Sequence, residues 1–479
     1  MPLRQSSPRP TRLALAMLCA LTACARQPAP APPPLQIDAL ASVPIGTSRQ
    51  ALPEDWWRLF NDPQLDRWVQ RALARNQDLA QAEANVQAML AGIAEFDAQR
   101  WPATALGLAA TYGKTADDQT LAKATDSHAS AQWQLNPRIE LAYQVDIWGQ
   151  VRAAIERAAV QADASAAALD LVRLNVVTQT SRAYVQHCTY SARLKQARQS
   201  LRSLERSVQL SQRQQQAGIA TELDRERLLA LREQLRAELP LLEAHRQMAL
   251  YELNMLSGQA ASAEAITCDS PPTLAAALPL GDGWQLLERR PDVRQAEREL
   301  RAAGLDVEIV TADLYPKVSF GASLTAADQH LGHLGDSRAV MFGIGPLITW
   351  QFPNVRANRA RVRKAEALQQ AQRAHYRGVA LAALKDVRQA LARFDGERRS
   401  LLAVTAALEH GQRAHALADF NYRAGALDGL ALLDSERELI RLRARQVDAQ
   451  GRLAQAQINL FRALGGRWQA PISKTGTQP

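Results

Sequence analysis

"AQRWPATALGLAATY" spans residues 98–112, and a similar stretch, "ADLYPKVSFGASLTA", spans residues 312–326. Each begins as the end of a helical pattern and then meets an aromatic residue followed by proline. After that pair, apolar residues alternate with small or polar ones, which predicts a strand. The two stretches lie 214 positions apart, so a largely helical chain forms strands at two equivalent places. This spacing indicates an internal repeat.

The repeat continues on both sides of these strands. "VRA" at 151–153 corresponds to "VRA" at 355–357, and "AGIATELDRERLL" (217–229) corresponds to "AGALDGLALLDSERELI" (424–440). We expect each copy to contain a helix, a strand hairpin, a very long helix, a turn at glycine and a further helix. The predicted segments are a lipoprotein signal peptide (1–23), a Pro-rich lipid-anchored tether (24–55), repeat 1 (56–259; hairpin 103–147, long helix 150–217, helix 221–257), a linker (260–283), repeat 2 (284–470; hairpin 317–352, long helix 355–423, helix 428–464) and a C-terminal tail (471–479).

The long helices should pack as coiled coils. Residues 151–217 contain neither glycine nor proline, which predicts an uninterrupted helix of roughly 100 Å at 1.5 Å per residue. Apolar or small residues recur every seven positions along it, and a second seam begins at Leu194, so we expect helical neighbours on two sides. The first seam comprises Ile155, Ala162, Leu169, Val176, Ala183, Tyr190, Ala197 and Leu204, and copy two repeats the pattern with Ala380, Val387, Phe394, Leu401 and Leu408.

Each copy also offers two strand candidates that flank a polar loop. Their apolar residues alternate with small or polar ones over about ten positions, which is the length and pattern of a membrane β-strand. In copy one the alternating residues are Leu106, Leu108, Ala110 and Tyr112, then Trp133, Leu135, Ile139, Leu141, Tyr143, Val145 and Ile147. In copy two they are Val318, Phe320, Ala322 and Leu324, then Val340, Phe342, Ile344, Pro346, Ile348, Trp350 and Phe352.

Strands in a bilayer require several chains to cooperate. A sheet edge within hydrocarbon would leave backbone N–H and C=O groups without partners, so membrane sheets close into barrels. Roughly eight strands are the smallest number that closes, so a chain with four must share its barrel with other copies. The strand count alone is compatible with a barrel of eight strands from two chains or of twelve strands from three chains. The alternative is that both hairpins pack on the helices of a soluble domain.

The N-terminus has the features of an export signal. Residues 1–12 carry three arginines and no acid, and the apolar core "LALAMLCAL" (13–21) is too short to span a bilayer. The core ends in "LTAC", which resembles the lipobox of bacterial lipoproteins, so Cys24 is the predicted lipidation site. A plain signal peptide with an incidental Cys24 is the alternative. Alanine rather than aspartate follows the cysteine, and by the same resemblance this implies the outer membrane. The proline- and alanine-rich segment "QPAPAPPP" (27–34) has the composition of a tether rather than of a packed core.

Over essentially the whole mature chain, the motifs resemble those of the TolC-like outer membrane efflux proteins, in particular the NodT-type lipoproteins of resistance-nodulation-division systems. No single motif is decisive, but their order and spacing are specific. They are "WWRLFNDPQLDRWVQRALARNQDLAQAEANV" (56–86), "YQVDIWGQVRAA" (143–154), "RRPDVRQAE" (289–297), "GPLITWQFPNVRANRARVRKAEA" (345–367), "RAGALDGLALLDSERELI" (423–440) and "FRALGGRW" (461–468).

This resemblance implies a mostly α protein with a membrane β-barrel portion. It implies a homotrimer whose twelve-stranded barrel takes four strands from each chain and continues as a periplasmic α-helical barrel. The implied partners are outer membrane lipid, a periplasmic adaptor (membrane fusion) protein and an inner-membrane resistance-nodulation-division transporter. The family's channel-closure positions correspond here to Tyr422, Leu430, Asp434 and Arg437. Because Asp434 and Arg437 are three residues apart on a helix, they could equally pair with each other.

One motif departs from the family pattern. Family members usually have glycine soon after the turn that leads from the last strand of each hairpin into the long helix. Copy one keeps Gly149, whereas copy two has Arg356 near that position. We therefore expect the turn geometry of copy two to differ locally.

The leading functional hypothesis is a passive exit duct for small molecules. A duct for type I protein secretion and a coiled-coil lipoprotein without a pore are the alternatives. An enzyme is disfavoured, because the sequence contains no nucleophile elbow, P-loop or dinucleotide fingerprint, and no cofactor is expected. His330 and His333 share a Gly-rich loop, but no cysteine or carboxylate pair accompanies them, so we predict no metal site.

Charge and cysteine content add two further expectations. Removing the signal peptide leaves 54 basic and 48 acidic residues, a balance of +6, and no dense basic run includes aromatic residues, so no nucleic-acid partner is expected. Besides Cys19 and Cys24, only Cys188 and Cys268 remain. A disulfide between them is compatible with an oxidising compartment, but two unpaired thiols is the prediction.

Overall fold

The structure is a computed structural model. It describes residues 47–48, 53–218, 221–260, 266–274, 278–279, 289–328, 331–337, 339–350 and 355–465. The predicted signal peptide, most of the tether and the C-terminal tail lie outside these residues, as do Cys24 and His330. So do residues 351–354, and with them the turn geometry expected before Arg356. Two short strands, β1 (Thr47–Ser48) and β4 (Leu278–Pro279), pair in parallel.

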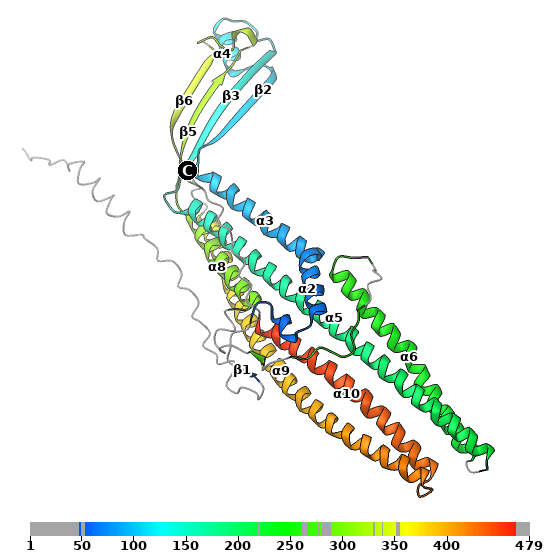
Figure 1. Cartoon of the computed structure of the whole chain (residues 1–479). Coiled ribbons are helices and arrows are strands. Elements are labelled where there is room, and N and C mark those ends of the chain that lie inside the picture. The colour runs from blue at the N-terminus through cyan, green and yellow to red at the C-terminus, as the bar shows by residue number, and fades with distance from the viewer. Residues whose placement is uncertain are drawn as a thin grey trace, which may run out of the picture. The chain divides into compact units, whose positions relative to one another are not determined.

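The two copies contribute to one antiparallel sheet of four strands. Its strand order is β2-β3-β5-β6, so each copy supplies one hairpin and the hairpins pair through β3 and β5 (Figure 1). The first hairpin ends at Val145 and the second at Thr349, both slightly before the predicted ends, and a short helix, α4, occupies the first loop where only polar loop was expected. The bounds are β2 Ala103–Gly113, α4 Ala116–Ala124, β3 Gln132–Val145, β5 Lys317–Ala326 and β6 Val340–Thr349.

One face of this sheet is apolar and open. The strand register places one apolar residue from each strand in a single row, and all four are exposed, between 47% and 83%. The row is Leu106, Ile139, Leu324 and Phe342. The neighbouring row on the opposite face contains Glu140, Ser323 and Gly343. The sheet is therefore sided as the sequence predicts, with an apolar face that nothing in the described chain covers.

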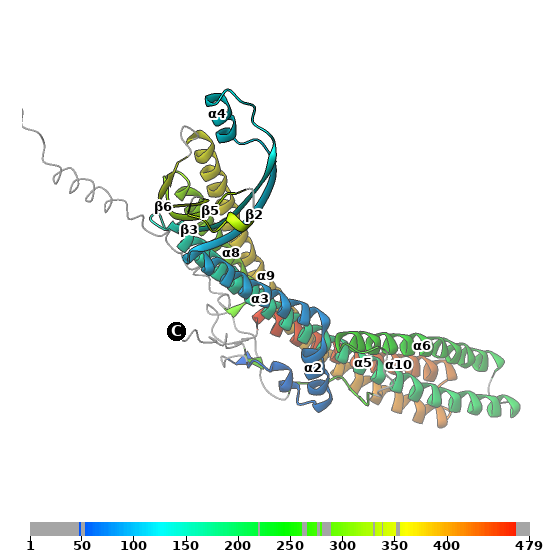
Figure 2. The same cartoon turned by 90° about the horizontal axis from the view of Figure 1, so that it is seen from above.

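Long helices form the rest of the described chain. Helix α3 packs on α5, α5 on α8, and α8 on α9, while α6 lies along the second half of α5 and α10 along the second half of α9 (Figures 1 and 2). Where the sequence predicts a helix over 150–217, α5 ends one residue earlier. The bounds are η1 Trp56–Phe60, α2 Pro63–Arg75, α3 Gln77–Asp97, η2 Ala98–Arg100, α5 Gln150–Gln216, α6 Glu222–Leu256, α8 Pro291–Ala312, η3 Leu331–His333, α9 Val355–Arg423 and α10 Gly429–Leu464.

The helices are held together by narrow apolar seams rather than by one wide core. Leu194 and Ala197 of α5 pack against Leu235 and Leu242 of α6. In the second copy, α9 and α10 meet through a corresponding cluster around Leu408. Seams of this kind bury one stripe of each helix and leave the other faces free for further neighbours.

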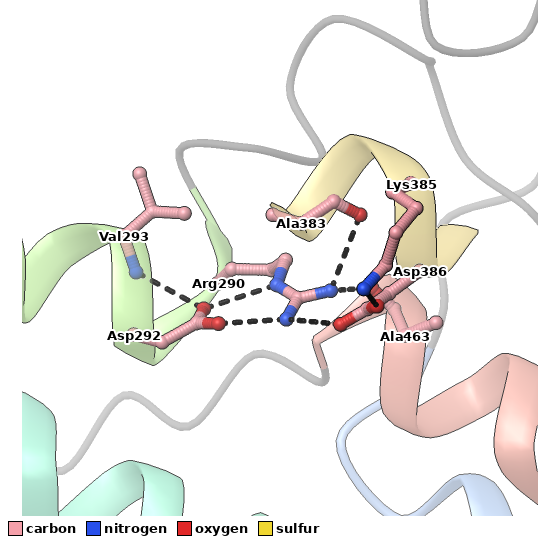
Figure 3. A network of polar contacts seen from close by, with 7 residues as sticks. All are labelled: Arg290, Asp292, Val293, Ala383, Lys385, Asp386 and Ala463. Atoms are coloured by element: carbon pink, nitrogen blue, oxygen red, sulfur yellow. Dashed lines mark hydrogen bonds and ion pairs between the residues drawn. The ribbon is translucent and has the colours of Figure 1, made fainter. Parts of the chain in front are cut away.

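In copy two, the start of α8 and the end of α10 meet at a buried arginine. Arg290, the residue before α8, is 9% exposed, and its Nη1 donates to the backbone oxygen of Ala463 at 3.0 Å. Its Nε and Nη2 bind both carboxylate oxygens of Asp292, at 3.0 and 2.7 Å, and Asp386 lies 3.6 Å from Nη2 (Figure 3). Arg290 thereby satisfies a carbonyl at the end of α10 and joins three helices, so it links the segments "RRPDVRQAE" and "FRALGGRW" in the folded chain.

The prediction of two unpaired thiols is wrong. Cys188 of α5 and Cys268 of the linker form a disulfide with their Cα atoms 5.2 Å apart. Thr267 beside it accepts a hydrogen bond from Gln64 of α2 at 2.8 Å, so the linker is fixed to two helices of copy one. The sequence could not specify this pairing, because it depends on where the linker crosses α5.

Candidate functional site

The helix pairs α5–α6 and α9–α10 turn at equivalent positions, at the ends of these helices that lie far from the sheet. Gly218 after α5 and Gly425 after α9 both have φ of 74°, a left-handed conformation that favours glycine. Each following helix then begins at a side-chain cap. Thr221 and Asp224 form a capping box at the start of α6, and Asp428 accepts a hydrogen bond from the Ala431 N–H at 2.9 Å at the start of α10. The chain therefore reverses sharply at both tips.

Tyr422 links the two tips. Its hydroxyl, in the last turn of α9, donates to Oε1 of Gln214 in the last turn of α5 at 2.8 Å. Leu430, at the second residue of α10, is 40% exposed, so the predicted closure residues include one apolar side chain that faces outward.

Asp434 and Arg437 lie one turn apart on α10. Their side chains approach to 3.8 Å, which is the within-helix pair that the sequence offered as an alternative. The contact is long, and 64% of the Asp434 side chain remains exposed, so it contributes little to stability. The structure thus brings Tyr422 to another helix but leaves Leu430, Asp434 and Arg437 on one open face of α10.

A polar cavity lies behind this face. It measures about 410 Å³ and is lined by α5, α6, α9 and α10. Glu436 projects into it while only 6% exposed, and its sole hydrogen-bond partner in the described chain is Ser207 Oγ, at 3.4 Å. Ser211, another lining residue, is 5% exposed, and its Oγ has no partner among the described residues.

Burial shifts the pKa values of two of the titratable groups that line this cavity, Glu436 and His415. It raises the pKa of the Glu436 carboxyl above its ordinary value, and neither the Ser207 hydrogen bond nor the nearby Arg443 reverses that direction. Burial lowers the pKa of His415, whose Nδ1 is 3.1 Å from Ser435 Oγ. Both groups are therefore shifted toward their neutral forms.

Sequence reasoning missed Glu436, Ser207 and Ser211. A signal for Glu436 was present, because it falls between Leu433 and Leu439 at the three-residue spacing of buried α10 positions. A charged residue at such a position indicates a polar interruption of the seam. The serines gave no comparable signal, since serine is common on exposed helix faces.

The described residues contain no group of three or more His, Cys, Asp or Glu side chains that could hold a metal ion. His333 lies 3.7 Å from Asp328, which is too few ligands for such a site. Among the described residues, no helix combines the length and the hydropathy needed to cross a membrane.

The chain is similar to several characterised proteins over nearly its whole length. A family model described as "Outer membrane efflux protein" matches residues 68–259 and 284–466. The pyoverdine export outer membrane protein OpmQ of Pseudomonas putida is 30% identical over 472 residues, covering 95% of this chain and 97% of OpmQ. The outer membrane protein OprJ of Pseudomonas aeruginosa is 31% identical over 86% of each chain. The solved structure of the outer-membrane channel OprN matches with a TM-score of 0.85 at 30% identity, covering 92% of this chain and 99% of OprN.

Proposed function

Since the chain belongs to the outer membrane efflux protein family, we propose that it is the outer membrane channel of a tripartite efflux pump. It acts as a passive exit duct for small molecules. An inner-membrane resistance-nodulation-division transporter supplies the energy, and a periplasmic adaptor protein connects that transporter to the helix tips.

The observation that carries this proposal is the sheet. Its apolar row from Leu106 to Phe342 is exposed across all four strands, while β2 and β6 form its two edges. An apolar face suits lipid, but unpaired strand edges do not. A homotrimer solves both problems, because β6 of one chain pairs with β2 of the next and twelve strands close the barrel.

The helix tips supply the closure. The Tyr422–Gln214 hydrogen bond holds the end of α9 against α5, and the open face with Leu430, Asp434 and Arg437 meets the same face of the other two copies at the threefold axis. Threefold symmetry triples each of these groups, so contacts that are weak singly act together. Opening then separates the α9–α10 pair from the α5–α6 pair.

Cys24 anchors the chain by a second route. Diacylation of its thiol adds buried CH₂ groups to the membrane attachment that the barrel already provides. Replacing Cys24 with alanine should leave a trimer that still requires detergent for extraction. A coiled-coil lipoprotein without a pore would instead become extractable without detergent.

Conductance in planar bilayers tests the duct directly. The purified trimer should conduct weakly, and Tyr422→Phe combined with Asp434→Ala should raise its conductance, because both remove contacts at the closed tips. Tyr251→Phe is the matched control, since this tyrosine is 54% exposed on α6, away from the tips. Absence of conductance from every variant would overturn the proposal. In cells, deletion should raise susceptibility to small toxic compounds; loss of a secreted protein instead would indicate type I secretion.

A further inference from the structure

An open cavity lies where the linker crosses α5. It measures about 850 Å³, and its walls come from α5, from α6 and from residues 266–269 of the linker. This volume lies within the range of about 300–1,000 Å³ that is usual for small-molecule sites. The cavity shares no lining residue with the cavity at the helix tips, and the proposed duct gives it no role.

Covalent and polar contacts hold the walls of this cavity in place. Cys268, which lines it, is joined to Cys188 of α5 by the disulfide, and the neighbouring Thr267 is hydrogen-bonded to α2. On the α6 side, Nδ1 of the buried His187 donates to the backbone oxygen of Arg246 at 3.2 Å. The three walls are therefore positioned before a ligand arrives, which lowers the cost of binding.

Four cationic side chains line the cavity. Lys195, Arg198 and Arg202 follow one another at spacings of three and four residues, so they share one face of α5, and Arg246 lines the same cavity from α6. Asp269 is the one acid among the described lining residues. Because like charges at these helical spacings repel each other, an empty cavity of this composition is electrostatically unfavourable.

The described chain compensates these cations only in part. Two of the four form ion pairs, and exposed pairs of this kind contribute little. Neither Arg202 nor Arg246 has an ion-pair partner among the described residues. The two pairs are Lys195 with Asp269 at 3.1 Å and Arg198 with Glu243 at 2.6 Å.

Copy two shows that the helix pair does not need these cations in order to pack. "VRA" at 151 and 355 sets an offset of 204 for the starts of α5 and α9, and "AG" at 217 and 424 sets one of 207 for their ends. By either offset the basic face of α5 corresponds to positions within 399–409, where only Arg399 is cationic, and it pairs with Asp395 at 2.9 Å. The offset of 207 places Leu453 at the position of Arg246. The basic cluster therefore belongs to copy one alone, as the disulfide does.

We infer that this cavity is a binding site for a small multivalent anion, whose carboxylate or phosphate groups bind Arg202 and Arg246 and extend toward Lys195. Guanidinium groups recognise both kinds of anion through paired, charge-assisted hydrogen bonds. Because the cations lie on two helices, an anion with two or more such groups binds both walls at once. The site is independent of the proposed duct, since it involves neither the sheet nor the helix tips.

Calorimetric titration of the purified full-length protein in detergent tests the site. The probes are citrate for carboxylates and inorganic pyrophosphate for phosphates, each at constant ionic strength. Arg202→Ala and Arg246→Ala should each weaken binding about tenfold, because each removes a hydrogen-bonding cation from the cavity. Arg213→Ala is the matched control, with an expected change below about twofold, because this exposed arginine lies on the same side of α5 roughly three turns beyond Arg202 and outside the cavity.

Asp269→Asn should have the opposite effect. Its side chain is 85% exposed, so the substitution leaves the fold intact while it removes the negative charge beside Lys195. Binding of either probe should tighten about threefold, because the anion no longer meets a like charge. A cluster with a purely structural role would not respond in this way.

The titrations separate the possible occupants. Binding of only one probe supports the site and identifies the group that it prefers. Equal weakening by Arg202→Ala and Arg213→Ala would overturn the site, since it would show unspecific attraction to a basic surface, and so would a lack of binding by both probes. Binding of poly-glutamate without either small anion would overturn the small ligand in favour of an acidic peptide. The conductance of the trimer tests the duct separately.

Discussion

In each repeat, a side chain just before the helix that leads to the sheet (α3 or α8) binds a backbone oxygen at the end of the last helix, but that side chain differs between the two repeats. In copy one, Asn76 caps α3 and its Nδ2 donates to the backbone oxygen of Leu256 at 3.0 Å. In copy two, Arg290 precedes α8 and donates to the oxygen of Ala463, also at 3.0 Å. The accepting carbonyls are equivalent, each two residues before a glycine with positive φ. What the repeat preserves is therefore the backbone acceptor, while the side chain that donates to it differs.

The two copies also differ in their disulfide and in the residues at their tips. Copy one alone has a disulfide, because both available cysteines, Cys188 and Cys268, belong to it or to the linker that follows it. Copy two alone has a buried acid at its tip, since the position of Glu436 is Leu229 in copy one. Copy one is thus reinforced covalently near its middle, and copy two carries the polar cavity beside the predicted closure.

Removing the disulfide should have the largest effect. It closes a loop with a sequence separation of 80 residues, for which chain entropy predicts about 4 kcal/mol of stabilisation. Cys188→Ala with Cys268→Ala should lower the free energy of unfolding by that order, measured by denaturant titration in detergent. Hydrogen exchange should rise in α6 and the linker but not in α10. An equal rise in both copies would contradict the assignment of this reinforcement to copy one.

The two equivalent donors should differ in strength. Arg290→Ala removes a buried cation that serves Ala463 and the Asp292 carboxylate, so we expect a loss of about 3 kcal/mol in the free energy of unfolding. Asn76→Ala removes a neutral amide and a helix cap and should cost about 1–2 kcal/mol. Thermal unfolding of both variants measures the difference. Arg399→Ala is the control, because this paired arginine is 70% exposed and should change little. Equal losses for Arg290 and Asn76 would show that the backbone acceptor alone matters.

Local patterns were sufficient to predict the strands and the long helices, because alternation along Leu106 to Tyr112 and the seven-residue seam through Val176 are properties of short windows. The TolC-like fold, which the family resemblance implied, is confirmed by the match to OprN. Helix α4 was missed, since nine residues in a loop show little periodicity.

Contacts between distant segments were the part that the sequence did not reveal. The disulfide, the Arg290 network and the Glu436 cavity each need two or three segments that meet only in the folded chain. Of the predicted closure residues, Asp434 and Arg437 lie where helix geometry puts them, but the partner of Tyr422, Gln214, is 208 positions away. The closure role itself stays a prediction.

The buried acid should give copy two a pH dependence that copy one lacks. Because burial raises the folded-state pKa of Glu436, the native state favours the protonated carboxyl, and its contribution to stability is present at low pH. That contribution is lost as the pH rises from the ordinary carboxyl value of 4.5 through the raised one. Glu436→Gln should therefore be more stable than wild type by about 1 kcal/mol at pH 8, with no advantage at pH 4.

Thermal unfolding of wild type and Glu436→Gln at pH 4, 6 and 8 measures this gap. The neighbouring charged and titratable residues His415, Asp419 and Arg443 are present in both proteins, so the difference between the two proteins isolates Glu436. Glu438→Gln is the matched control, since that glutamate lies on the exposed side of α10 and its substitution should change the unfolding temperature little. If the stability difference between wild type and Glu436→Gln did not change with pH, the cavity would contain enough water to keep the carboxylate solvated. The difference between Leu229 in copy one and Glu436 in copy two would then affect only the shape of the tip.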